Sequence, residues 1–331
     1  MSLFRLPLAF ALALGLSAGS AVAQERALVI GTGPAAGNYF PVGGALCRVL
    51  NQGRADDGAR CLVEATSGSA ENLRRLGQGD FDLAIVQSDW QFHAPSSLET
   101  VEQGSAEADG QAVRAVLSLQ AQPLTLIAGP ESGIDGLADL AGKRVSLAPE
   151  GSSLRAATLS LLEAMGWQAS DLEIAATPAG PEMIEALCRG QIDAALLPLS
   201  HPSGLVKAAA ERCNARLIPL EPAVIELVER AWPFYGRADI PGGLYAGHPE
   251  ATPTIGLRAT LVASAALSDD VVYRLVARLF GQLEALRAQH PLLAHLAPGE
   301  MVAKGNTISF HDGAIRYYEE QDLPLPTQNS E

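Results

Sequence analysis

The sequence predicts an α/β protein built from two similar lobes, and two observations lead to this prediction. Short apolar runs alternate with helical patterns along the 331-residue chain, an order typical of a largely parallel sheet covered by helices. The pattern Glu-x-apolar-x-x-Leu-x-x-Gly-x-apolar-Asp-x-Ala at residues 71–84 also recurs at residues 182–195, at a constant offset of 111 positions (182 − 71). A repeated helix, glycine and strand predicts two copies of one unit, and the chain is long enough for two lobes.

The first half of the chain shows the alternation most clearly. We expect strands over residues 27–30, 61–65 and 81–86, and helices over residues 41–50 and 69–77. Pro41 suits the first turn of its helix, and Ser69 can cap the helix that follows it. In the two copies of the repeat, Gly79 and Gly190 stand where a left-handed residue can end a helix before the strand begins.

Two proline-containing stretches, residues 123–129 and 219–253, are the expected crossings between the lobes. We therefore expect lobe one to comprise residues 24–125 and 246–331, and lobe two residues 126–245. Two α/β lobes joined in this way leave a cleft between them. Ligands of such folds bind where strands end and helices begin.

Residues 1–23 predict a secretory signal peptide. Arg5 supplies the positive charge, residues 6–18 are apolar, and Ala21-Val22-Ala23 fits the small-x-small cleavage rule. A retained membrane anchor is the alternative, but the apolar run is shorter than the ~20 residues that a span needs. We expect a soluble, exported protein that begins at Gln24.

Charge and composition exclude several classes of function. The formal net charge is −14, which disfavours nucleic acid and anionic membrane surfaces as partners. Hydrophobic residues make up 48% of the chain, so the bulk of it is not disordered. Aromatic residues make up only 5%, which disfavours a sugar site walled by several rings.

The four cysteines predict disulfides, because an even number in an exported chain is typical of them. Three connectivities are possible. We expect the sequential one, Cys47–Cys61 and Cys188–Cys213, in which each pair joins a helix to the next strand.

Two loops in the first part of the chain carry candidate binding residues. The loop at residues 31–41 follows a strand and opens a helix, so its N–H groups can receive an anion. Asn38 and Tyr39 add polar groups there, although a plain tight turn is the alternative. The loop at residues 64–72 has the same arrangement. Thr66 and Ser67 are its candidates, although local turn chemistry explains them too.

Two further loops follow later strands. Gln87 and Ser88 lie at the carboxyl end of a strand, where α/β sheets place functional groups. The loop at residues 148–155 enters a helix through Ser152 or Ser153. Arg155 can hold a carboxylate with two hydrogen bonds, and a solvated surface arginine is the alternative.

We expect no cofactor, metal or catalytic machinery. The third glycine of residues 31–37 comes one position late for a dinucleotide fingerprint, and residues 136–144 fail the P-loop spacing. There is no Cys-x-x-Cys and no pair of histidines at helical spacing for zinc. No nucleophile–base pair is supported by spacing.

Seven motifs together resemble the TAXI-type solute receptors of TRAP transporters, over nearly the whole chain after residue 23. They are G-T-G-x-x-x-G-x-Y-x-P at 31–41, E-x-T-x-G-S-x-x-N at 64–72, D-L-A-I-V-Q-S-D-W-Q-F-H-A at 82–94, L-A-D-L-A-G-K-R-V at 137–145, H-P-S-G at 201–204, I-P-G-G-x-Y at 240–245 and H-D-G-A-x-x-Y-Y at 311–318. The placement of the cysteines also resembles a subgroup of these receptors.

The resemblance implies a type II periplasmic binding protein fold with an inter-lobe cleft. It implies a monomeric periplasmic receptor without catalysis, which captures a small carboxylate such as glutamate or 2-oxoglutarate for an ion-driven membrane permease. The ligand-binding residues that it implies are Asn38, Tyr39, Thr66, Ser67, Ser69, Gln87 and Ser88 from lobe one, Gly151, Ser152 and Arg155 from lobe two, and Tyr245 near the crossing.

Two departures from the family pattern bear on the solute. Ser153 and Leu154 replace the Gly and Thr of the usual G-S-G-T-R. Relatives often carry aromatic residues and a glycine just before His-Pro, where this chain has Leu196-Leu197-Pro198-Leu199-Ser200. Both changes alter the shape of the pocket. The alternative functions are a receptor that feeds a sensor kinase and an enzyme built on the same scaffold.

Overall fold

The computed structural model describes residues 27–35, 37–53, 60–94, 113–147, 155, 158–159, 162–163, 166–174 and 180–326. The predicted signal peptide at residues 1–23 lies outside these described residues. Within them, no helix is both long enough and apolar enough to cross a membrane.

One ten-stranded sheet runs through the molecule in the order β2-β1-β3-β10-β4-β7-β5-β6, with β9 added to β10 and β8 added to β4. The strands are β1 (Ala27–Gly31), β2 (Arg60–Glu64), β3 (Leu83–Gln87), β4 (Val113–Ala128), β5 (Arg144–Ser146), β6 (Glu173–Ile174), β7 (Ala194–Pro198), β8 (Arg216–Ile218), β9 (Gly236–Ile240) and β10 (Thr252–Ser264). The pairs β1–β2, β1–β3, β5–β6 and β5–β7 are parallel, whereas β10 is antiparallel to β3, β4 and β9.

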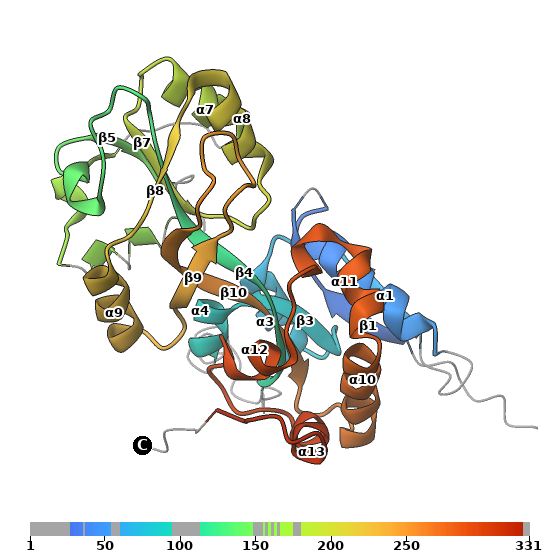
Figure 1. The fold of residues 1–331 in the computed structure, drawn as a ribbon. Coiled ribbons are helices and arrows are strands. Elements are labelled where there is room, and N and C mark those ends of the chain that lie inside the picture. The colour runs from blue at the N-terminus through green and yellow to red at the C-terminus, as the bar shows by residue number, and fades with distance from the viewer. Residues whose placement is uncertain are drawn as a thin grey trace, which may run out of the picture.

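The two longest strands, β4 and β10, connect the two lobes (Figure 1). In Figure 1 the lobe with β5 and β7 lies above the lobe with β1 and β3, and they are called the upper and the lower lobe. The amino-terminal part of β4 pairs with β10, and residues 124–128 pair with β7 in the upper lobe. Likewise, residues 259–263 of β10 pair with β3 in the lower lobe, and residues 252–256 pair with β9. The predicted α/β fold of two lobes is confirmed. The stretch at residues 123–129 was one of the two expected crossings, and there β4 passes from pairing with β10, where Gly256 lies opposite Pro123, to pairing with β7.

Helices cover both faces of the sheet in the lower lobe. The helices here are α1 (Tyr39–Asn51), α3 (Ser69–Gly77), α4 (Ser88–Phe92), α10 (Asp269–Gly281), α11 (Leu283–Gln289), α12 (Pro298–Ala303) and α13 (Asp312–Glu320), with a 3-10 turn η3 (Pro291–Leu293). Leu83 and Ile85 of β3 face the core under α1, α10 and α13, whereas Ala84 and Val86 face α3. This alternation is the two-residue period of a strand buried on both faces.

The upper lobe repeats this arrangement with α7 (Pro181–Cys188), α8 (Gly204–Cys213) and α9 (Pro222–Ala231), and with the 3-10 turns η1 (Leu137–Leu140) and η2 (Ala169–Asp171). Ala195 and Leu197 of β7 face α7 and α8, and Ala194 and Leu196 face the core under α9.

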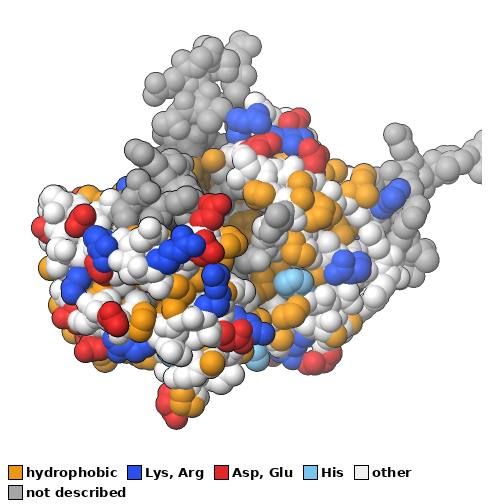
Figure 2. Space-filling view, turned by 90° about the horizontal axis from the view of Figure 1, so that it is seen from above, with side chains coloured by type: hydrophobic (Ala, Val, Ile, Leu, Met, Phe, Trp, Pro, Cys, Tyr) orange, Lys and Arg blue, Asp and Glu red, His pale blue; other side chains and the backbone are white. Residues whose placement is uncertain are grey.

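On the face of the molecule seen from above, Lys and Arg side chains are interspersed with Asp and Glu side chains and do not gather in one patch (Figure 2).

The predicted repeat is confirmed in its details. Gly79 and Gly190 have φ angles of 77° and 65°, the left-handed conformation that a Cβ disfavours. The carboxylate of Asp82 accepts a hydrogen bond from Val29 N of β1 (3.0 Å), and that of Asp193 accepts one from Arg144 N of β5 (2.8 Å). Each aspartate therefore ties the start of its strand to the neighbouring parallel strand.

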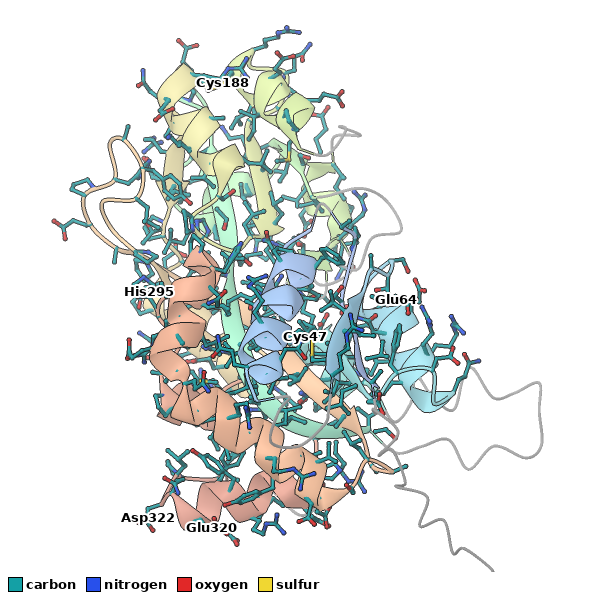
Figure 3. All side chains as sticks on the ribbon, turned by 90° about the vertical axis from the view of Figure 1, so that its right-hand side faces the viewer. Cys47, Glu64, Cys188, His295, Glu320 and Asp322 are labelled. Atoms are coloured by element: carbon teal, nitrogen blue, oxygen red, sulfur yellow. A yellow bond between two sulfur atoms is a disulfide. The ribbon has the colours of Figure 1, made fainter. Side chains whose placement is uncertain are left out.

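Both disulfides have the predicted sequential pairing, Cys47–Cys61 and Cys188–Cys213. The first joins α1 to β2, as expected. The second joins the ends of α7 and α8, so the expectation of a helix-to-strand link is wrong there. Figure 3 shows Cys47 within the lower lobe and Cys188 towards the far end of the upper lobe.

Replacing Asp193 with alanine should lower the free energy of unfolding by about 2–3 kcal/mol, because Asp193 also accepts two hydrogen bonds from the Arg144 guanidinium (2.7 and 3.1 Å). Urea unfolding of the oxidised protein measures this loss. Asp312→Ala is the control, since this exposed aspartate begins α13 far from the repeat. An equal effect of the two substitutions would contradict the tying role.

Mild reductant should open Cys188–Cys213 before Cys47–Cys61. Cys47 and Cys61 are 6% and 3% exposed, whereas Cys188 and Cys213 are partly exposed, and thiol–disulfide exchange requires access to a sulfur atom. Differential alkylation followed by mass spectrometry measures the order. Subsequent opening of Cys47–Cys61 should lower the free energy of unfolding by about 3 kcal/mol, because the disulfide no longer restricts the 14-residue loop in the unfolded chain. Simultaneous opening of the two pairs would show that burial does not set the order.

Candidate functional site

A cavity of about 270 Å³ lies where the two lobes meet beside β4. Its lower-lobe wall comes from the β1–α1 loop, the start of α3 and the end of β3, and its upper-lobe wall comes from the end of β7. The lining residues are Gly33, Pro34, Gly37, Asn38, Tyr39, Ser67, Gly68, Ser69, Gln87, Gln122, Pro198, Leu199 and Ser200. Five of the predicted site residues, Asn38, Tyr39, Ser67, Ser69 and Gln87, are therefore brought together.

Two helices begin at this cavity. The first backbone hydrogen bonds into α1 and α3 are Val42 N to Asn38 O and Asn72 N to Gly68 O. The amides that precede Val42 and Asn72 at the helix starts have no partner inside the helix. Gly68 has a φ of 120°, which lets the chain turn sharply into α3. The positive ends of two helix dipoles thus converge on one space, an arrangement that favours an anion.

An uncharged hydrogen-bond network spans the cavity floor. Tyr39 Oη donates to Gln122 Oε1 at 3.1 Å, and Gln87 Nε2 donates to the same oxygen at 2.8 Å. Gln87 N in turn donates to Ser69 Oγ at 3.1 Å. Because its oxygen accepts twice, the side-chain amide of Gln122 is held in one orientation, with its NH₂ group as a donor.

Sequence analysis missed Gln122 and Ser200. Gln122 lies next to Pro123 in a strand that also carries Ser118, Gln120 and Thr125, so its residue type alone did not mark it as a site residue. Ser200 is 4% exposed, and its hydroxyl has no hydrogen-bond partner among the described residues. It offers a donor and an acceptor from the upper lobe. The departing stretch at residues 196–200 does reach the cavity: Leu197 is buried in the core under α7 and α8, but Pro198, Leu199 and Ser200 line the cavity.

Thr66 and Ser67 build the turn that leads into α3. Thr66 Oγ1 is within 2.8 Å of Asn72 Oδ1 and accepts a hydrogen bond from Gly68 N at 3.1 Å, and the side chain does not line the cavity. Ser67 lines the cavity, but its N–H and hydroxyl both donate to Glu71 Oε2 at 2.8 Å. These bonds hold the pKa of Glu71 below its usual value, so that carboxylate stays charged.

Ser88 lies under the cavity wall, where its hydroxyl joins three segments. Ser88 Oγ donates to Phe234 O at 2.9 Å and accepts from Arg258 N at 3.1 Å. It connects α4 to the β9 and β10 region that crosses between lobes. The structure therefore gives Ser88 a framework contact and does not place it on the cavity surface.

Tyr245 is buried at 6% exposure and does not line the cavity. Its hydroxyl accepts from Ser203 N at 2.6 Å and lies 2.6 Å from His201 Nδ1. Burial lowers the pKa of His201 to about 4, so the ring is neutral near pH 7. Tyr245 then donates to Nδ1, and Nε2–H donates to Thr125 Oγ1 at 2.9 Å. The hydroxyl is fully used in this chain of hydrogen bonds.

The loop at residues 148–155, from which we expected three binding residues of lobe two, is only partly within the described structure. Gly151 and Ser152 lie outside the described residues, together with Ser153 and Leu154. Arg155 is helical and partly buried.

The described residues that line the cavity include no Asp, Glu, His, Lys or Arg. An acid–base reaction needs a titratable group within hydrogen-bond reach of the substrate, and these walls supply only hydroxyl, amide and backbone groups. Among the described residues, no group of three or more His, Cys, Asp or Glu side chains is placed to hold a metal ion. The described walls are suited to binding a solute.

A family model described as the NMT1-like family matches residues 30–321. The chain belongs to the NMT1-like family. All seven motifs of the sequence analysis lie within this match.

Solved structures show the same fold at low sequence identity. XAC2383 from Xanthomonas citri bound to ATP matches with a TM-score of 0.52 and 12% identity, covering 89% of this chain and 98% of that chain. The same protein bound to a chloride ion gives 0.50 and 12%, with 89% and 99% covered. The periplasmic aliphatic sulphonate binding protein SsuA from Escherichia coli gives 0.46 and 16%, with 90% and 84% covered. The NMT1-like chain thus shares its two-lobed α/β fold with XAC2383.

One titratable group lies close to the tyrosine of the network. Asp89, on α4, has its pKa raised to about 6 from 3.8 by burial, against an opposing hydrogen bond from Trp90 N at 2.8 Å. Its charge adds to burial in raising the pKa of Tyr39 and of Tyr235. Tyr39 therefore keeps its proton and remains a donor.

Replacing Asp89 with asparagine should change the pH dependence of stability. The folded state holds the Asp89 proton more tightly than the unfolded state. The contribution of Asp89 to the free energy of unfolding is therefore complete below about pH 4 and is lost as the pH rises through about 6. At pH 7.5 the variant should be more stable than the wild-type protein by about 2 kcal/mol, and at pH 4 this advantage should vanish.

Urea unfolding at the two pH values measures this difference, with Asp80→Asn, an exposed aspartate after α3, as the control. A stability gain that is the same at both pH values would contradict the assignment to Asp89 ionisation.

Proposed function

We propose that this protein is an extracytoplasmic receptor that binds a small organic acid and delivers it to a TRAP-type membrane permease. The observation that carries the proposal is the convergence of the α1 and α3 amino-termini on a cavity whose described walls hold no acidic side chain. Such walls attract a carboxylate at contact range and do not repel it.

The net charge of −14 is compatible with anion capture. Distant surface charge is screened within about 8 Å at physiological salt. Helix-terminal N–H groups act at hydrogen-bond distance. The cavity chemistry, and not the overall charge, should therefore set solute preference.

For this role we propose the following division of the chain into an export signal and two lobes. Residues 1–23 act as the export signal to the periplasm, residues 24–125 with 246–331 form lobe one, and residues 126–245 form lobe two. Gly151, Ser152 and Arg155 complete the cavity from lobe two. Solute binding shifts an equilibrium between open and closed lobes, and the protein works as a monomer.

A thermal-shift screen of oxidised residues 24–331 against carboxylates, amino acids, sugars, phosphates and cations tests the solute class. At ~100 times its dissociation constant, a solute stabilises the protein by ~2.7 kcal/mol, enough to raise Tm by several degrees. Dicarboxylates or acidic amino acids should give the largest shifts. Shifts only with sugars or cations would contradict the proposal.

Replacing Tyr39 with phenylalanine should then weaken binding of the best solute about tenfold, because the variant loses the hydroxyl that orients Gln122. Gln122→Leu should weaken it further, and calorimetric titration gives both affinities. Tyr273→Phe is the matched control, since its hydroxyl contacts Glu320 at the far side of the lower lobe. Unchanged affinity in the Tyr39 and Gln122 variants would exclude this cavity as the site.

A further inference from the structure

A second cavity, of about 280 Å³, lies on the other face of the crossing strands. Ala121 and Pro123 of β4 line it, whereas Gln122 lines the first cavity. Since successive side chains of a strand point to opposite faces, the two cavities lie on opposite sides of β4. The second cavity shares no lining residue with the first and is distinct from the proposed solute site.

Both lobes contribute to this second cavity. β9 and His201 supply its upper part, and the segment from η3 to α12 supplies its lower part. Figure 3 shows His295, one of the lining residues, on the C-terminal helical segment of the lower lobe. Any occupant would therefore contact both lobes.

Gln120 supplies an unsatisfied amide to the wall. The residue lies at the register shift of β4 against β10, between the pairs Ala121–Arg258 and Ser118–Thr260. It is 5% exposed, and neither its side-chain nitrogen nor its side-chain oxygen has a hydrogen-bond partner among the described residues. A buried amide without partners destabilises a fold, so an occupant that supplies a donor or acceptor relieves that cost.

The positive charge in this cavity exceeds the negative charge. Arg258 is fixed by Ser118 Oγ (2.8 Å), Leu119 O (3.0 Å) and Glu300 (3.5 Å). Lys304 shares the same Glu300 carboxylate at 2.8 Å, so that carboxylate is divided between two cations.

Arg237 adds a third cation, and Asp239 adds the second acid. The Arg237 backbone N–H donates to Glu229 at 2.7 Å, but its exposed guanidinium makes no ion pair with a described residue. His201 is uncharged near pH 7, as argued above. The cavity therefore has room for one more negative charge beside Arg237.

An apolar wall faces these charges, formed by Leu119, Leu292 and Leu296. We propose that the second cavity is a binding site for a small organic acid with one carboxylate and an apolar body. Arg237 and Lys304 hold the carboxylate, the three leucines contact the body, and Gln120 gains a hydrogen-bond partner.

Calorimetric titration of oxidised residues 24–331 with phenylacetate tests the site, with the neutral phenylacetamide as the matched probe. Phenylacetate should bind saturably at one site and at least tenfold more tightly than phenylacetamide. Arg237→Gln should weaken phenylacetate binding about tenfold, whereas Arg316→Gln, an exposed arginine on α13, should leave it unchanged. Tyr39→Phe, in the first cavity, should also leave it unchanged.

Gln120→Leu gives an independent readout. It should raise the Tm of the unliganded protein, because it removes the unpaired amide, and reduce the Tm increment that phenylacetate produces. Absence of saturable binding, equal binding by Arg237→Gln and the wild-type protein, or loss of binding in Tyr39→Phe instead would each overturn the proposal. The outcome is independent of the first cavity, which is probed by its own variants and solutes.

Discussion

The backbone pairing of β4 with β10 is the constraint on which the rest of the structure depends. These strands belong to both lobes, so their ladder fixes the distance and angle at which the lobes meet. Side chains on the ladder cannot be moved to another face without shifting the register of the whole strand. Gln122 is thereby committed to one cavity, and Ala121 and Arg258 to the other.

Local sequence was sufficient for those parts of the fold that local physics determines. Gly79 and Gly190 had to end helices because few other residues adopt their backbone angles, and the first two cysteines lay close enough along the chain to meet across one helix–strand unit. Distant contacts were out of reach. The pairing of Cys188 with Cys213 was predicted, but the expected helix-to-strand link was wrong, because α7 and α8 pack side by side and the spacing of the cysteines does not encode that packing.

The candidate site shows the same division. Asn38, Tyr39, Ser69 and Gln87 were found because strand-to-helix loops expose backbone amides wherever they occur. Thr66, Ser88 and Tyr245 belong to the same residue types, but the structure places their hydroxyls in framework hydrogen bonds. A serine that holds a turn and a serine that meets a solute look alike in sequence. Only the position of the partner atom distinguishes them, and for Ser88 and Tyr245 that partner comes from a distant segment.

The two copies of the internal repeat differ in the hydrogen-bond donors at their helix starts. At the offset of 111 residues, Ala70 of α3 corresponds to Pro181 of α7. Proline at the first turn of a helix has no N–H to offer, so α7 lacks a donor that α3 keeps. The upper lobe instead reaches the cavity through the loop after β7, where Ser200 has a hydroxyl without a described partner. Among the described residues, the two lobes thus contribute to the cavity through different segments, the start of α3 in one and the end of β7 with the loop after it in the other.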